Sequence, residues 1–272
     1  MTTPSTNAPA PPNPELIIRK LDSTTTIFSA PFLRGPIPFG GRSTAITLKD
    51  GSLFLAASHA LDPPTLDTLT SLGNGQVKHL VVLDVEHTMF TKQYLDAFPQ
   101  AQLYLPAGAV PKFKKSGVLP ADESKYFVFG TEKTTGEGGG EDPLSKATGG
   151  EMQSADFGKA FVNEDIAFFH APTKTVIQAD LLFNLPPSEQ YSRTSSRSTL
   201  PLISAHLKPG TKTHQRFLWH ALSKDKSEMS RQAKKVAGWD FDRMIPCHGD
   251  VIETAGKKAW VDTYKWFLDP EQ

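Results

Sequence analysis

Three short apolar runs, each ending in a side chain able to bind a metal, most constrain how this chain can fold. Residues 77–83, 175–179 and 241–246 have the length and composition of buried strands. Candidate ligands follow each run: Asp84, Glu86 and His87 after the first, Asp180 after the second, and His248 after the third. Ligands in layered α/β folds gather where strands end, so the three ends predict one shared site.

The composition indicates a globular chain of 272 residues, of which 38% are hydrophobic and 21% charged. Lysines and arginines total 29, and so do aspartates and glutamates. Because no basic excess is present, we expect neither nucleic acid nor an anionic membrane as a partner. The single cysteine, Cys247, excludes an internal disulfide and a zinc site made of cysteines alone.

Two segments have compositions that do not favour a packed core. Residues 1–14 are rich in threonine, proline, alanine and asparagine and lack the features of a secretory signal, which predicts a disordered tail and a cytoplasmic protein. Residues 131–150 contain six glycines among polar residues, which predicts a flexible insertion. The remainder of residues 15–272 is expected to form one domain.

The other elements alternate strands with helices. Asp50-Gly51 predicts a tight turn between strands at 43–48 and 52–57, and a second hairpin is expected at 159–170. Helices are expected at 64–72, 91–98, 215–238 and 256–268. Two strand-rich halves with flanking helices predict an α/β (α+β) fold, a four-layer αββα sandwich of two mixed β-sheets.

The order of these elements and ligands resembles that of the metallo-β-lactamase superfamily. Its first motif is His-x-His-x-Asp-His after a buried strand, and residues 82–87 occupy this place. His87 keeps its identity, whereas Val82, Asp84 and Glu86 replace the first histidine, the second histidine and the aspartate. Asp180 resembles the family's bridging aspartate and His248 its last histidine. The family's further histidine has no counterpart between residues 149 and 165. The resemblance implies an αββα fold with a metal site along one edge of the sheets.

The implied ligand set is Asp84, His87, Asp180 and His248, holding one divalent ion. Carboxylates in place of histidines favour iron or manganese more than a histidine-rich site would, although zinc also accepts carboxylates. Glu86 has two interpretations: a general base that assists water, or an acid paired with a lysine or arginine.

Other candidates are weaker. His59 follows a strand and is a candidate for the rim of the site, and Arg193 and Arg197 are candidates to bind an anionic substrate. Cys247 is expected to be buried and inert, because adjacent strand residues point to opposite faces.

These features favour a metal-dependent hydrolase that cuts an ester, lactone or thioester bond in a small molecule. Two alternatives stay open: a catalytically degenerate binding or scaffold protein, which the missing histidines favour, and an iron-dependent redox enzyme on the same fold.

Overall fold

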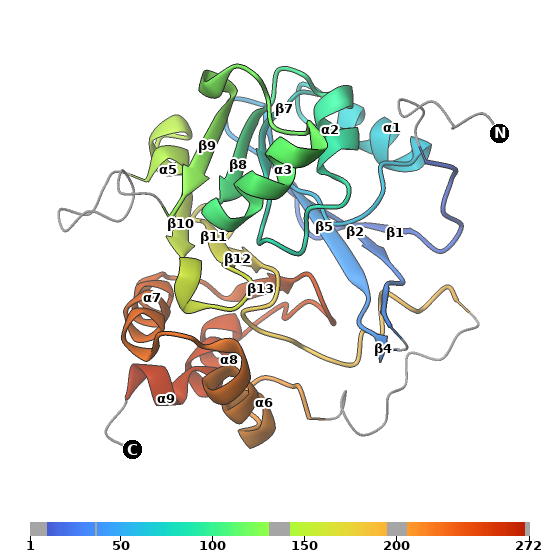
Figure 1. The fold of residues 1–272 in the computed structure, drawn as a ribbon. Helices are drawn as coiled ribbons and strands as arrows, with labels where there is room; N and C mark the ends of the chain where they lie inside the picture. Colours follow the sequence, from blue (N-terminus) through green and yellow to red (C-terminus); the bar gives the residue numbers. More distant parts are fainter. Residues whose placement is uncertain (1–9, 36, 131–141, 195–205, 270–272) are drawn as a thin grey trace.

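Two β-sheets packed face to face, with helices on both outer faces, form the fold (Figure 1). The computed structural model describes residues 10–35, 37–130, 142–194 and 206–269. The predicted αββα sandwich is confirmed.

The first sheet has seven strands in the order β1-β2-β5-β6-β7-β8-β9. Their bounds are Ile17–Lys20, Thr25–Ala30, Gly41–Thr47, Leu53–Ala56, Val77–Val81, Gln102–Pro106 and Tyr126–Phe129. Strands β6 to β9 run parallel to one another, and the remaining pairs are antiparallel. The sheet is therefore mixed, as predicted.

The second sheet has the order β10-β11-β12-β13, with bounds Met152–Asp156, Ile166–His170, Thr175–Gln178 and Arg243–Pro246. Only β12 and β13 are parallel, with Gln178 opposite Pro246. A small separate hairpin is formed by β3 (Leu33–Arg34) and β4 (Ile37–Pro38).

The helices fall into two groups. In the N-terminal half they are α1 (Pro63–Ser71), α2 (Thr91–Ala97) and α3 (Val110–Ser116). Later in the chain they are α5 (Pro143–Ala147), α6 (Lys212–Phe217), the π-helical turn η4 (Leu218–Leu222), α7 (Lys226–Gly238), α8 (Gly256–Thr263) and α9 (Lys265–Leu268). Short 3-10 turns are η1 (Ala107–Ala109), η2 (Glu123–Lys125) and η3 (Gly158–Ala160). None of the helices in the described ranges combines the length and apolar character needed to span a bilayer.

Three apolar cores separate the four layers. Alternation along a strand sends neighbouring side chains to opposite faces. In β2, Ile27 packs between the two sheets and Phe28 packs under α1 to α3. In β11, Phe168 packs between the sheets and Phe169 packs under α7 to α9. The continuous apolar runs of these strands therefore reflect burial on both faces.

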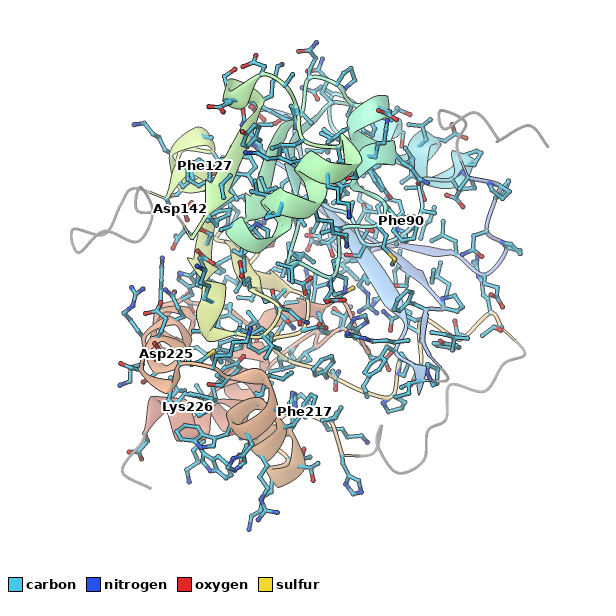
Figure 2. The ribbon with its side chains drawn as sticks, viewed as in Figure 1. Phe90, Phe127, Asp142, Phe217, Asp225 and Lys226 are labelled. Atoms are coloured by element: carbon cyan, nitrogen blue, oxygen red, sulfur yellow. The ribbon has the colours of Figure 1, made fainter. Side chains whose placement is uncertain are left out.

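Polar side chains begin several helices. Asp142 and Asp225, labelled in Figure 2, accept backbone N–H groups at the starts of α5 and α7. Such a cap satisfies amides that the first helical turn leaves without a partner. The caps fix where α5 and α7 begin.

The structure corrects three local predictions. Residues 158–160 form η3, so β11 pairs with β10 and not with a strand at 159–163. In the predicted flexible insertion, residues 143–147 form α5, which Asp142 caps, and Leu144 is buried between the sheets. Residues 131–141 lie outside the described residues. In the predicted N-terminal tail, Ala10 and Asn13 donate backbone hydrogen bonds to the loop at Leu61 and Asp62. Residues 1–9 lie outside the described part.

Candidate metal centre

The three strand ends singled out in the sequence meet at one edge of the sandwich. Asp180 and His248 come two residues after the ends of the parallel neighbours β12 and β13. His87 comes from the other sheet, in the loop after β7. Backbone hydrogen bonds of 2.9 and 3.0 Å from this loop to Ile166 and Asn163 tie the two sheets together here. The site therefore forms where both sheets present the ends of parallel strands.

His87 and His248 face each other through their Nε2 atoms, 3.2 Å apart. The Nδ1 atom of His87 lies 2.8 Å from both oxygens of Asp84, and the Nδ1 atom of His248 lies 2.5 Å from the carbonyl oxygen of Gly40. Both partners are acceptors, so each Nδ1 carries the ring proton. The neutral form of each ring then points an Nε2 lone pair at the other ring.

Asp180 adds an oxygen to the same point. Its Oδ1 atom lies 3.3 Å from Nε2 of His248 and, although buried, accepts no hydrogen bond from the described residues. Its Oδ2 atom accepts a 2.5 Å hydrogen bond from the side chain of Asn163. The carboxylate is thereby turned so that its other oxygen faces His248.

These atoms fit a bound cation. Two imidazole nitrogens and a carboxylate oxygen follow one another at 3.2 and 3.3 Å, and with neutral rings the tautomers set by Asp84 and Gly40 leave both Nε2 atoms without a proton. A buried polar atom without a partner is costly, and lone pairs that face one another repel. A divalent ion bound to two imidazole nitrogens and a carboxylate oxygen would satisfy all three.

Asp84 is fully buried and orients His87. It accepts hydrogen bonds from the backbone N–H groups of Glu86 and His87 as well as from the imidazole. Burial raises the pKa of Asp84, but the His87 charge and these hydrogen bonds outweigh it and leave that pKa below its usual value. Burial opposes protonation of His87, yet the Asp84 charge raises the pKa of His87 well above its usual value. One ligand atom from each of Asp84, His87 and Asp180 lies within 4.8 Å of the others, and the ligand role of Asp84 stays a prediction.

Cys247 lies on the inner side of the histidine pair. Ligand atoms of His87, Cys247 and His248 all lie within 4.8 Å of one another. Burial raises the pKa of the Cys247 thiol, but His87 and His248 lower it to a net value of about 6. The expectation that this cysteine points away from the site is therefore wrong. The alternation rule applies within a strand, and β13 ends at Pro246.

Asp165 supports the centre, although the sequence analysis did not single it out. Its carboxylate accepts the backbone N–H groups of Asp180 at 2.5 Å and Leu181 at 3.1 Å. Burial, followed by the charges of Asp84 and Asp180, raises the pKa of Asp165 well above its usual value. Asn163 and Asp165 sit in the turn between η3 and β11, and their only signal in the sequence is a polar cluster before an apolar run.

A buried arginine holds the turn that carries His248. Nη1 of Arg42 donates to the carbonyl oxygens of Pro246 at 2.7 Å and Gly249 at 2.6 Å. Gln190 bonds the same turn through the carbonyl oxygen of Cys247 and the N–H group of Gly249. These contacts fix where the His248 ring lies.

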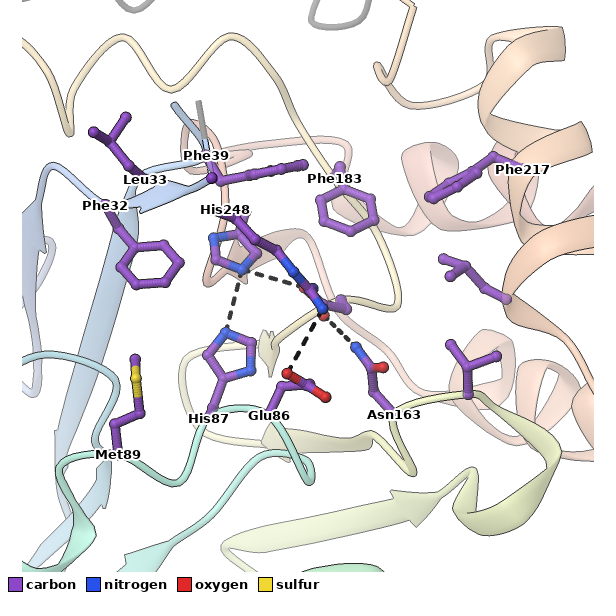
Figure 3. Close-up of a pocket in the computed structure, with 15 residues that line it drawn as sticks. Phe32, Leu33, Phe39, Glu86, His87, Met89, Asn163, Phe183, Phe217 and His248 are labelled. Carbon is purple, nitrogen blue, oxygen red and sulfur yellow. Dashed lines mark hydrogen bonds and ion pairs between the residues drawn. The ribbon is translucent and has the colours of Figure 1, made fainter. Parts of the chain in front are cut away.

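A cavity of about 470 Å³ opens onto the metal centre (Figure 3). His87, Asp180 and His248 are part of its lining. Its walls are largely apolar, formed by Phe32, Leu33, Phe39, Met89, Val162, Phe183, Phe217 and Leu222. The ring of Phe183 stacks on that of His248 with 6.0 Å between centroids. The few other polar side chains of the lining are Arg34, Glu86 and Asn163.

Glu86 lines this cavity and is half exposed. Its Oε2 atom lies 3.6 Å from the guanidinium of Arg34 on the β3–β4 hairpin. Glu86 therefore has an arginine partner, as the ion-pair interpretation of the sequence expects. It also lines the cavity, as the general-base interpretation requires.

The remaining predicted residues lie elsewhere. His59 is buried, with its ring nitrogens bonded to Ser43 and Thr65, and it does not line the cavity. Arg193 donates to the carbonyl oxygen of Leu16, also away from the cavity. The structure therefore does not support a substrate-binding role for either residue, and Arg197 lies outside the described residues.

Known proteins resemble this chain in structure but not in sequence. No protein-family model and no curated protein matches the sequence. Among solved structures, a metallo-β-lactamase from Erythrobacter litoralis superposes with a TM-score of 0.59 at 12% identity, covering 93% of this chain and 96% of that one. A metallo-β-lactamase from Hirschia baltica gives 0.55 at 9% identity, covering 93% and 97%.

The metallo-β-lactamase FIM-1 from Pseudomonas aeruginosa, solved in its mono-zinc form, gives a TM-score of 0.55 at 12% identity with 98% of both chains covered. These matches extend over nearly the whole chain. The protein therefore has a metallo-β-lactamase-like fold.

Proposed function

We propose that this protein is a metal-dependent hydrolase in which His87, Asp180 and His248 hold one divalent ion. The observation that carries the proposal is the close approach, in the lining of a cavity, of two imidazole nitrogens and a carboxylate oxygen that accepts no hydrogen bond from the described residues. The mono-zinc form of a protein with a similar fold adds support for a single ion.

When bound, such an ion polarises a carbonyl group and lowers the pKa of water to about 7. The side chains of this protein supply the remaining functions. Asp84 fixes the tautomer of His87, and Asn163 orients Asp180. Glu86 reaches the cavity and accepts the proton of the attacking water as general base, while Arg34 holds its carboxylate in place.

The cavity favours a substrate with an apolar part next to the bond that is cut. Leu33 and Met89 are 60% and 59% exposed, which is unusual for large apolar side chains, and both line the cavity. Apolar side chains exposed around a hollow mark a surface that a ligand covers. We therefore assign an ester, lactone or thioester with an aliphatic or aromatic acyl group as the substrate class.

A chain-length series of p-nitrophenyl esters tests this function. Protein stripped of metal and reloaded with zinc, iron or manganese should hydrolyse the esters, and the stripped protein should not. The kcat/KM value should rise from the acetyl to the octanoyl ester as apolar area is buried. Activity that is absent with every metal and every ester would contradict the proposal.

A matched pair of variants locates the acyl group. Leu33→Ala should raise KM for the octanoyl ester by roughly three- to tenfold, the value of part of one buried leucine side chain. Ile18→Ala is the control, because Ile18 is also an exposed aliphatic side chain but does not line the cavity. Equal KM values for the octanoyl ester in both variants would show that the acyl group does not bind against Leu33.

A further inference from the structure

The thiol of Cys247 is one component of the centre that the proposed function does not use. Cys247 is the single cysteine of the chain and is buried directly after β13. It lies in the same group of closely spaced ligand atoms as His87 and His248.

A small void lies beside Cys247. Its volume is about 20 Å³, and its lining includes Cys247, His87 and His248. A space of this size holds about one water molecule or ion. The void and the large cavity have both histidines in their linings, together with Phe32 and Met89.

The surroundings of Cys247 hold it rigidly. Its N–H group donates to the carbonyl oxygen of Gln178 at 3.0 Å, and its carbonyl oxygen accepts from Gln190 at 2.7 Å. An inert core cysteine needs only apolar neighbours. This cysteine has two imidazoles beside it, and their Nδ1 atoms already have partners in Asp84 and Gly40. The buried Asp180 Oδ1 atom, which accepts no hydrogen bond from the described residues, is a second and independent sign that an ion belongs at this point.

We propose that the sulfur of Cys247 is a ligand of the ion held by His87 and His248, an inference that rests on the metal site proposed above. The sulfur–metal bond forms as the thiol proton is released to solvent. The sulfur then joins the two imidazole nitrogens as a donor. A thiolate favours zinc over manganese, which reverses the preference expected from the carboxylates alone.

Cobalt(II) reports the ligand directly, because thiolate coordination gives a near-ultraviolet charge-transfer band that nitrogen and oxygen ligands do not. Metal-stripped full-length protein is titrated with cobalt chloride. We expect the visible bands of bound cobalt together with the charge-transfer band. With one cysteine in the chain, this band has a single source.

Two variants sharpen the result. Cys247→Ser should lose the near-ultraviolet band and keep the visible bands. Met89→Leu controls for the other sulfur of the void lining and should keep both. Visible bands without a charge-transfer band in the wild-type protein would overturn the assignment of Cys247 and leave the metal site intact. Failure of the wild-type protein to bind cobalt at all would overturn the metal site and this inference together. The decisive spectrum is that of the wild-type protein, so it does not depend on the folding of a variant.

Discussion

The imidazoles of His87 and His248 approach to 3.2 Å through their Nε2 atoms, which carry no proton when the rings are neutral, because Asp84 and Gly40 accept from the Nδ1 atoms. The two residues are 161 positions apart in the sequence and come from different sheets. A close contact between two acceptors is stable when a cation lies between them. This pair is therefore the structural basis for the proposed metal site.

Replacement of Glu86 separates proton transfer from metal binding. Glu86→Gln keeps the size of the side chain but removes the base, so turnover of the reloaded protein should fall by about 10²–10⁴-fold. Zinc content should not change, because His87, Asp180 and His248 remain. Loss of zinc in this variant would instead make Glu86 a ligand.

Removal of Arg42, which bonds the turn that carries His248, should lower the stability of the protein. Arg42→Ala leaves the carbonyl groups of Pro246 and Gly249 without donors and Glu189 without a buried cation. We expect the free energy of unfolding to fall by about 3–5 kcal/mol and zinc to bind more weakly. Arg231→Ala is the control, because Arg231 is exposed and forms only a surface pair with Glu228, which is worth about 1 kcal/mol or less. Similar urea midpoints for the two variants would show that Arg42 does not hold the turn.

Gly249 should tolerate no side chain. Its φ angle is +93°, and a Cβ atom would lie 2.2 Å from the carbonyl oxygen of Asn184. Gly249→Ala should therefore lower the melting temperature and weaken zinc binding, because the turn must move to relieve the contact. Gly117→Ala is the matched control, with a φ angle of +66° but open space around the added methyl group. An equal fall in melting temperature for Gly117→Ala and Gly249→Ala would contradict this prediction.

Acid should destabilise the fold through buried neutral histidines. Burial lowers the pKa of His214 to about 4, from an unfolded value of about 6.5. Between these values the unfolded chain binds more protons, so stability is complete above about pH 6.5 and falls as the pH drops towards 4. The expected slope is up to about 1.4 kcal/mol per pH unit for this residue.

Urea unfolding between about pH 7 and 4.5 measures this slope. His214→Gln should reduce the loss of stability in acid, whereas His206→Gln, at an exposed position, should not. Parallel curves for the wild-type protein and His214→Gln would assign the acid sensitivity to other groups, of which His59, with a pKa lowered to about 4, is the first candidate.

The sequence predicted the layers and the three strand ends well because both depend on local patterns. Strands β7, β12 and β13 are short and mostly buried, and the polar residues after them lie at one edge. Neither pattern depends on distant contacts, so both can be read from the chain itself.

The parts of the site that the sequence missed depend on contacts between distant segments. Arg42 is buried because it bonds a turn more than 200 residues away. Asn163 and Asp165 meet Asp180 only once the strands pair. His59 satisfies both ring nitrogens with neighbours that no spacing rule identifies.

Zinc titration of metal-stripped protein tests the central claim most directly. The account predicts that the wild-type protein binds one zinc ion per chain, and that Asp180→Ala and His248→Ala each lose this binding. His206→Gln should titrate like the wild-type protein. Wild-type protein that binds no more zinc than His248→Ala would contradict the account.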